Sequence, residues 1–220
     1  MKKYTTAVFD LDGTIFDSSE GIITSLAHVF RTCNIEPPPK DVLFKFIGPP
    51  LYDSFMKTMG VTKERGMELT LTFREHYSAG AIYLAKPYDG IFDLFDALKA
   101  KGLKLAIATY KQQPQVDLLA ERFNLTKWMD AVAGADTQAN TKALIIEKAL
   151  KQCGTLPADT VMIGDTMQDR TGALGAGTDF IGVSYGFEFT DEEADRYQND
   201  PSAAEFPIVK TPLDILKLIS

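Results

Sequence analysis

One stretch near the start of the 220-residue chain decides its fold: Thr6-Ala7-Val8-Phe9-Asp10-Leu11-Asp12-Gly13-Thr14. The run up to Phe9 is short and mainly apolar, and a polar cluster follows it directly. This pattern predicts a buried strand that ends in a tight loop. Residues two apart in an extended chain point to the same side, so Asp10 and Asp12 are expected to face one site. Gly13 allows the chain to leave the strand sharply.

The rest of the chain shows two kinds of pattern. Residues 16–85 have helical periodicity, with breaks at prolines and glycines and no convincing strand. Beyond them, helical segments alternate with short apolar runs at 103–108, 131–133, 160–163, 180–183 and 208–209. Strands that alternate with helices predict a parallel sheet with helices on both faces. We therefore expect an α/β fold: a Rossmann-like, doubly wound core from residues 1–15 and 86–220, with a small helical cap domain, residues 16–85, inserted after the first strand.

The composition argues against several classes of function. The chain has 23 Lys and Arg residues against 30 Asp and Glu residues, and its net charge of −7 opposes binding to nucleic acid or an anionic membrane. No apolar run approaches the roughly 20 residues that cross a bilayer. Cys33 and Cys153 lie far apart in the sequence, a pattern typical of reduced thiols in a cytoplasmic protein. We expect a cytoplasmic protein, a monomer or weak homodimer, that acts on a small molecule.

Polar side chains follow successive strands of the predicted sheet. They are Asp10, Asp12, Thr109, Asp165 and Asp169, with Lys142 near the start of a helix that follows another strand. Ligands bind at the carboxyl ends of the strands in open α/β sheets, so these side chains are expected to share one crevice. Four ionised carboxylates share a small site only when a cation neutralises them. Oxygen ligands without His or Cys favour Mg²⁺, which we expect as the cofactor.

Four segments of the chain resemble, in order, the motifs of haloacid dehalogenase-like phosphatases. The first motif, Asp-x-Asp-Gly-Thr, is similar to residues 10–14. The second, an apolar strand ending in Thr or Ser, resembles residues 105–109, and Lys142 resembles the lysine of the third. The fourth, Gly-Asp-x-x-x-Asp, is similar to residues 164–169. The resemblance spans nearly the whole chain and implies the fold already expected from the alternating pattern.

This resemblance also implies a role for each residue. Asp10 is expected to attack phosphorus and form an aspartyl phosphate, while Asp12 protonates the leaving alcohol and then deprotonates the hydrolytic water. Mg²⁺ is expected on the Asp10 carboxylate, the Asp12 carbonyl and Asp165, with Asp169 supporting this set from outside. The residues expected to bind substrate are Gly13, Thr109, Tyr110, Lys111 and Lys142.

The motifs narrow the choice of reaction. Dehalogenases of the family lack the second aspartate of the first motif, because they have no alcohol leaving group to protonate, so the presence of Asp12 disfavours a dehalogenase. Sugar phosphomutases usually lack the second aspartate of the fourth motif, so Asp169 disfavours a phosphomutase. A small helical cap directly after the first motif resembles phosphoglycolate phosphatases, and further segments, among them 46–51 and 182–186, resemble their 5′-nucleotidase-like subgroup. We expect hydrolysis of a small soluble phosphomonoester. A β-phosphoglucomutase-like mutase, an inorganic pyrophosphatase and a non-catalytic regulatory protein of the same fold stay open as alternatives.

The cap is expected to select the substrate, because the core recognises only the phosphoryl group and the metal. Its candidate contacts include Arg74 and Tyr77, although helix surface and cap interior are the simpler interpretations of these two residues. Hinges are expected at 14–17 and 85–90, where the cap joins the core, and we expect the cap to close over bound substrate.

Overall fold

The computed structural model describes residues 3–203 and 205–219. The chain forms two compact units, one from Met1–Phe16 and Pro87–Ser220 and the other from Asp17–Lys86. We call them the core unit and the helical unit. Met1, Lys2, Ala204 and Ser220, which the expected core domain includes, lie outside the described residues. The action of the helical unit as a moving cap stays a prediction.

The core unit contains a six-stranded sheet in which every neighbouring pair of strands is parallel. The strand order is β5-β4-β1-β6-β7-β8. The strands are β1 (Thr6–Phe9), β4 (Lys104–Gln112), β5 (Met129–Ala135), β6 (Thr160–Gly164), β7 (Asp179–Val183) and β8 (Ile208–Val209). The order reverses direction at β1, which makes the sheet doubly wound. The expected α/β fold class is confirmed.

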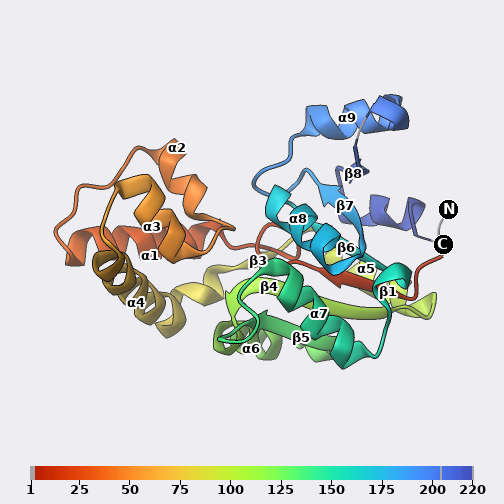
Figure 1. Cartoon of the computed structure of the whole chain (residues 1–220), viewed down its shortest axis with the longest axis horizontal. Helices are drawn as coiled ribbons and strands as arrows, with labels where there is room; N and C mark the ends of the chain where they lie inside the picture. The colour runs from red at the N-terminus through yellow and green to blue at the C-terminus, as the bar shows by residue number, and fades with distance from the viewer. Residues whose placement is uncertain (1–2, 204, 220) are drawn as a thin grey trace. The chain divides into compact units, whose positions relative to one another are not determined.

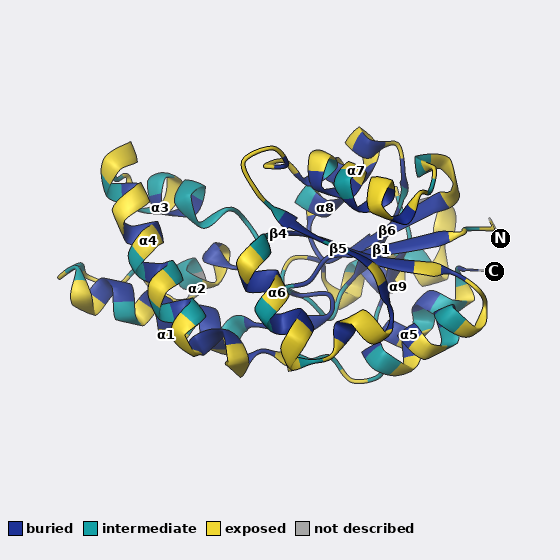
Figure 2. Cartoon of the chain, turned by 90° about the horizontal axis from the view of Figure 1, so that it is seen from below, coloured by how far each residue is buried: buried dark blue, intermediate teal, exposed yellow. Residues whose placement is uncertain are grey.

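Helices cover both faces of this sheet (Figure 1, Figure 2). On one face lie α5 (Ile91–Ala100) and α6 (Gln113–Arg122), and on the other α7 (Lys142–Cys153) and α8 (Met167–Ala176). Toward the C-terminus follow α9 (Asp191–Asn199) and the short 3₁₀ helix Pro212–Lys217. Because both faces of the sheet are covered, its central strands read as continuous apolar runs rather than as alternating patterns.

The core of this unit is built from those central strands. Val8, Ala106 and Met162, on three neighbouring strands, are completely buried in one apolar cluster with the inner faces of α7 and α8. On the opposite face, Phe9 packs edge-to-face on Phe95 of α5, with ring centroids 5.1 Å apart. Figure 2 shows the central parts of these strands as buried, while the helices that cover the sheet have exposed outer sides. The rigid sheet therefore determines where the residues after each strand lie.

The register of the sheet aligns the end of β1 with positions on its two neighbouring strands, β4 and β6. Phe9, the last residue of β1, pairs with Ile107 of β4 on one side and with Ile163 of β6 on the other. The backbone N–H of Asp10 continues the ladder by donating to the Ile163 carbonyl at 2.9 Å. The residues that follow these positions therefore gather at one edge of the sheet.

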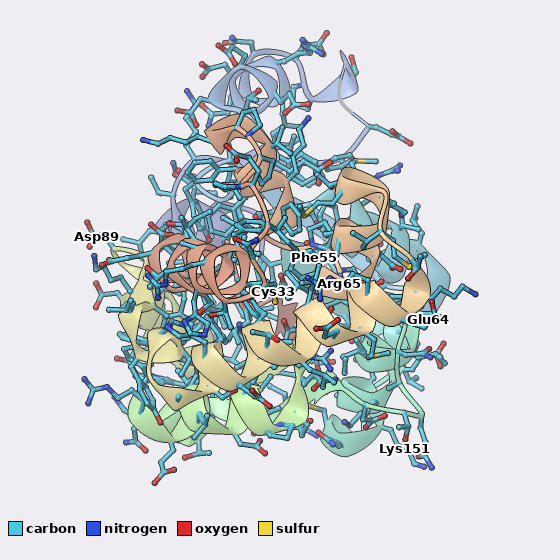
Figure 3. The ribbon with its side chains drawn as sticks, turned by 90° about the vertical axis from the view of Figure 1, so that its left-hand side faces the viewer. Cys33, Phe55, Glu64, Arg65, Asp89 and Lys151 are labelled. Carbon is cyan, nitrogen blue, oxygen red and sulfur yellow. The ribbon has the colours of Figure 1, made fainter. Side chains whose placement is uncertain are left out.

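The helical unit has a small core of its own. It consists of α1 (Ser19–Thr32), α2 (Lys40–Leu43), α3 (Leu51–Met59) and α4 (Lys63–Ala79), with short 3₁₀ turns at Phe44–Phe46 and Ala81–Leu84. Leu26, Phe55 and Leu69 are fully buried among these helices. Arg65 of α4 donates to the carbonyl of Cys33, just after α1, at 3.2 Å (Figure 3). The chain passes between the units through β2 (Phe16–Asp17) and β3 (Lys86–Pro87), which form a two-stranded sheet.

Tyr77, one of the candidate substrate contacts, lies inside the helical unit. Tyr77 is 1% exposed and stacks on Phe73 with ring centroids 5.3 Å apart, so it packs the interior of the helical unit.

Across residues 3–203 and 205–219, no helix combines the length and the apolar character that crossing a membrane requires.

Candidate active site

Three carboxylates meet beyond the ends of β1 and β6. Asp10 follows β1, Asp165 follows β6, and Asp169 stands in the first turn of α8. One oxygen from each lies within 4.8 Å of the others, and all three residues are buried. The structure thus brings together three of the four aspartates that the sequence places at strand ends.

Lys142 contacts two of these acids, Asp10 and Asp169. It is the first residue of α7, its side chain is 2% exposed, and its Nζ lies 2.6 Å from both Asp10 Oδ1 and Asp169 Oδ1. The backbone N–H of Lys142 donates to the Tyr110 hydroxyl at 3.1 Å, which satisfies one of the free N–H groups at the start of the helix. A Cβ at Gly172 of α8 would lie only 2.4 Å from Lys142 Cγ, so glycine leaves the space that this side chain needs.

The orientation of Asp165 is determined by donors from two distant segments. Thr14 Oγ1 donates to its Oδ1 at 3.3 Å, and the Phe187 N–H donates to its Oδ2 at 2.8 Å. Gly13 has a φ of +84°, and a Cβ there would lie 2.0 Å from Asp165 Oδ2. Gly13 is therefore required both by its backbone conformation and by the close approach of Asp165.

Asp169 has a second task besides binding Lys142. Its Oδ2 accepts from the backbone N–H and the hydroxyl of Thr166, at 3.1 and 2.6 Å, and the Thr166 hydroxyl accepts from the Asp169 N–H. This reciprocal arrangement is a capping box at the start of α8. It holds the carboxylate in one orientation, so Asp169 Oδ1 faces Lys142.

Burial and neighbouring charges raise the pKa values of two of the acids, Asp10 and Asp165. Burial raises the pKa of Asp10 to about 7, with Lys142 opposing this shift and Asp169 adding to it. Burial, followed by the charges of Asp169 and Asp10, also raises the pKa of Asp165 well above its ordinary value. Burial alone would lower the pKa of Lys142, but the two carboxylates in contact with it outweigh that effect and raise it. The ammonium of Lys142 therefore stays charged.

The donor set fits a divalent cation. Three ionised carboxylates and one ammonium leave two uncompensated negative charges in a buried cluster. All ligand atoms of the cluster are oxygens, which suit a hard ion such as Mg²⁺. Asp10 and Asp165 would hold the ion, while Asp169, occupied by Lys142 and Thr166, supports the set from the side. The uncompensated charge adds to the effect of burial in raising the pKa values of Asp10 and Asp165 when no cation is bound.

Asp12 has a partner different from those of the other aspartates. Its Oδ2 lies 3.0 Å from Lys111 Nζ, and the two side chains are 12% and 5% exposed. Among the described residues, Asp12 Oδ1 is buried and has no hydrogen-bond partner. Thr109, on β4, accepts the Lys111 N–H through its Oγ1 at 3.2 Å, so its own hydroxyl proton is available to an oxygen of a ligand.

The contacts just described involve all nine of the site residues expected from the sequence. Sequence reasoning missed the contacts between them: the Lys111–Asp12 pair, the Tyr110–Lys142 hydrogen bond, and the support of Asp165 by Thr14 and Phe187. The contact between Thr166 and Asp169 could have been predicted, because the two residues have the sequence spacing of a capping box. The catalytic and ligand-binding roles of the nine residues stay predictions.

Comparisons with known proteins identify the family of the chain. A family model described as "Haloacid dehalogenase-like hydrolase" matches residues 7–183. The chain is 34% identical over 192 residues to a 5′-nucleotidase of Pseudomonas aeruginosa, covering 86% of this chain and 87% of that protein. It is 32% identical over 182 residues to the tyrosine-protein kinase PtkA of Mycobacterium tuberculosis, covering 82% of this chain but only 62% of the kinase.

A solved structure shows the same likeness over almost the full length. The crystal structure of a predicted phosphatase from Clostridium acetobutylicum is 33% identical and superposes with a TM-score of 0.86, covering 99% of this chain and 98% of that chain. The motif order, the doubly wound sheet and these matches together confirm the resemblance noted from the sequence. The chain therefore belongs to the haloacid dehalogenase-like hydrolases.

Proposed function

We propose that the protein is a magnesium-dependent phosphatase that hydrolyses a small phosphomonoester through an aspartyl phosphate on Asp10. The observation that carries this proposal is the buried cluster of three acids and one lysine, which leaves two negative charges for a divalent cation, directly beside Asp12. Phosphoryl transfer needs mainly positioning and charge stabilisation, and this set of residues supplies both.

In the first half of the reaction Asp10 is the nucleophile. A carboxylate oxygen donates an electron pair to phosphorus while the bond from phosphorus to the leaving oxygen breaks, and that oxygen takes the bonding pair. Asp12 gives its proton to the leaving oxygen. Lys142 holds Asp10 through a 2.6 Å contact and offsets negative charge near the phosphoryl group. The Thr109 hydroxyl donates to a phosphoryl oxygen.

In the second half a water molecule replaces Asp10 on phosphorus. Asp12, now a carboxylate, takes a proton from the water as it attacks, and the bond between phosphorus and Asp10 breaks. Phosphate leaves, and both aspartates return to their starting protonation states. A bound Mg²⁺, held by Asp10, Asp165 and the Asp12 carbonyl, would neutralise charge on the phosphoryl oxygens.

Release of inorganic phosphate from p-nitrophenyl phosphate, measured with and without Mg²⁺, tests the proposal. We expect release that depends on the metal and stops on chelation. A clean preparation that releases no phosphate under either condition contradicts the proposal and favours the non-catalytic alternative. Transfer of phosphate between sugar positions without net release would favour the mutase.

The substrate is best sought with a small panel. Nucleoside monophosphates enter it because a relative named a 5′-nucleotidase is 34% identical over most of its length. Phosphoglycolate enters it because of the sequence motifs, and pyrophosphate and sugar phosphates represent the two alternative reactions. The compound with the highest kcat/KM identifies the substrate class.

Metal binding is expected to depend on pH in a defined direction. Without metal, folded Asp10 has a pKa of about 7, above the ordinary value of 3.8, so the folded state holds a proton that the unfolded state releases. The free energy of unfolding of the metal-free protein should therefore fall as pH rises between these two pKa values, from 3.8 to about 7. Mg²⁺ must displace that proton, so the rise in Tm on adding Mg²⁺ should be larger at about pH 8 than at about pH 6. Thermal unfolding with Mg²⁺ or chelator at both values measures it, and an equal or reversed difference contradicts it.

Removing the proposed general acid should slow the reaction selectively. Asp12→Asn is expected to lower kcat by about 10²- to 10⁴-fold, the usual contribution of general acid–base catalysis. The loss should be smaller for p-nitrophenyl phosphate than for an alkyl phosphate, because p-nitrophenolate needs little protonation. Steady-state kinetics on the two esters measure this ratio, and equal losses on both would contradict acid catalysis by Asp12.

A further inference from the structure

The ladder between β4 and β5 is interrupted at the edge of the active site. Thr109 pairs with Gly134, but the next paired residue of β4 is Gln112, opposite Ala135. Tyr110 and Lys111 therefore form a bulge of two residues with no counterparts in β5. Bulges redirect side chains, and they are common beside active sites.

The bulge is supported by specific contacts. The Lys111 N–H donates to Thr109 Oγ1 at 3.2 Å, a hydrogen bond within the bulged segment of β4 itself. A Cβ at Gly134 would lie 2.8 Å from both the Lys111 carbonyl oxygen and Gln113 Cα, so only glycine lets β5 approach this closely. The conformation is thus built into the packing of the two strands.

The two side chains of the bulge, Tyr110 and Lys111, contact two different residues of the site, Lys142 and Asp12. The Tyr110 hydroxyl accepts from the Lys142 N–H at 3.1 Å, while the Lys111 ammonium lies 3.0 Å from Asp12 Oδ2. Only 5% of the Lys111 side chain is exposed, and its ammonium is engaged with Asp12. Its contact holds one oxygen of Asp12 and leaves Oδ1 without a partner among the described residues.

We propose that Lys111 is a positioning residue that fixes the carboxyl group of Asp12, so that Oδ1 is the oxygen that exchanges the proton with the leaving group and with water. This inference rests on the proposed phosphatase function. As the bond to phosphorus breaks, the leaving oxygen takes the bonding electron pair and receives the proton from Asp12 Oδ1. The ammonium of Lys111 then faces the resulting carboxylate and offsets its charge.

The inference predicts an effect that depends on the leaving group. Lys111→Met keeps most of the side-chain volume but removes the charge and the donor. We expect it to lower kcat by about 10- to 100-fold for an alkyl phosphate, a part of the full contribution of Asp12, and by less than about threefold for p-nitrophenyl phosphate. KM should change little for either ester. Lys111→Arg, which keeps a cation, should recover part of the lost rate.

The matched control is Lys217→Met. Lys217 is also paired with an aspartate, but its side chain is 78% exposed near the C-terminus. Equal losses on both esters, or a raised KM with unchanged kcat, would overturn the inference and indicate substrate binding or a merely structural role. Thermal unfolding shows whether each variant folds. If Lys111→Met does not fold, the same ester ratio measured on Lys111→Arg decides, because its altered geometry should still affect the alkyl ester more.

A second measurement tests whether Lys111 acts through Asp12. In the Asp12→Asn background, Lys111→Met should change the rate on phenyl phosphate by less than about twofold, because the proton donor is already absent. The same fold-loss in both backgrounds would show that Lys111 acts independently of Asp12. Wild-type protein that hydrolyses no ester would contradict the proposed function itself, whereas active wild type with a uniform Lys111→Met effect contradicts only this inference.

Discussion

Lys142→Met is expected to abolish turnover and to lower the free energy of unfolding by about 3–5 kcal/mol, the usual penalty for removing one partner of a buried ion pair. The substitution leaves Asp10, Asp165 and Asp169 buried together without a cation from the protein. The penalty should shrink at lower pH, because Asp10 and Asp165, whose pKa values are raised, then take up protons, and it should also shrink when Mg²⁺ is added. Urea denaturation at about pH 6 and about pH 8, with and without Mg²⁺, measures these changes.

Lys151→Met is the matched control for this experiment. Lys151 lies on the same helix, α7, and is exposed (Figure 3). We expect it to alter stability by no more than about 0.5 kcal/mol, as is usual for surface substitutions. A Lys142→Met protein as stable as this control at about pH 8 without metal would contradict the view that Lys142 neutralises the cluster.

Asp10→Asn is expected to reduce phosphate release to background. An amide is not a nucleophile toward phosphorus, so no aspartyl phosphate can form. Folding should survive, because the substitution removes one of three buried like charges and leaves Asp169 paired with Lys142 at 2.6 Å. Loss of phosphate release in a variant that still folds would therefore be a catalytic effect and not a structural one.

Two measurements check this prediction. Phosphate release gives the rate, and intact-mass analysis after acid quenching detects a phosphate adduct on the wild-type chain that should be absent from Asp10→Asn. Thermal unfolding of the metal-free variant should give a Tm no lower than that of the wild type. Near-wild-type turnover by Asp10→Asn would rule out the covalent mechanism.

The expected β4 illustrates where the sequence is informative and where it is not. An apolar run predicts a strand over 103–108, yet β4 runs from Lys104 to Gln112. The extra residues, Thr109 to Gln112, do not form an apolar run, because this end of the strand lies at the edge of the sheet where polar side chains face the site. Local hydrophobicity finds the buried part of a strand and stops where burial gives way to function.

The sequence by itself predicted the parallel sheet, which the structure confirms, and a set of candidate site residues. Apolar runs separated by helical periodicity are a local signal, and parallel strands place their carboxyl ends together, so Asp10, Thr109 and Asp165 were predicted to converge. Lys142 was less certain from the sequence alone, because a lysine on an amphipathic helix is usually exposed. In the folded chain its side chain is 2% exposed and is paired with Asp10 and Asp169, two acids from segments far apart in the sequence.

Only the tertiary structure decided which oxygen faces which cation. The Lys111–Asp12 pair joins residues far apart in the sequence, and it depends on a bulge that Gly134, on another strand, permits. The raised pKa values of Asp10 and Asp165 likewise come from burial and from neighbouring charges at long sequence separation. Such contacts have no local pattern, because their free energy depends on distances that exist only after the strands and helices have packed.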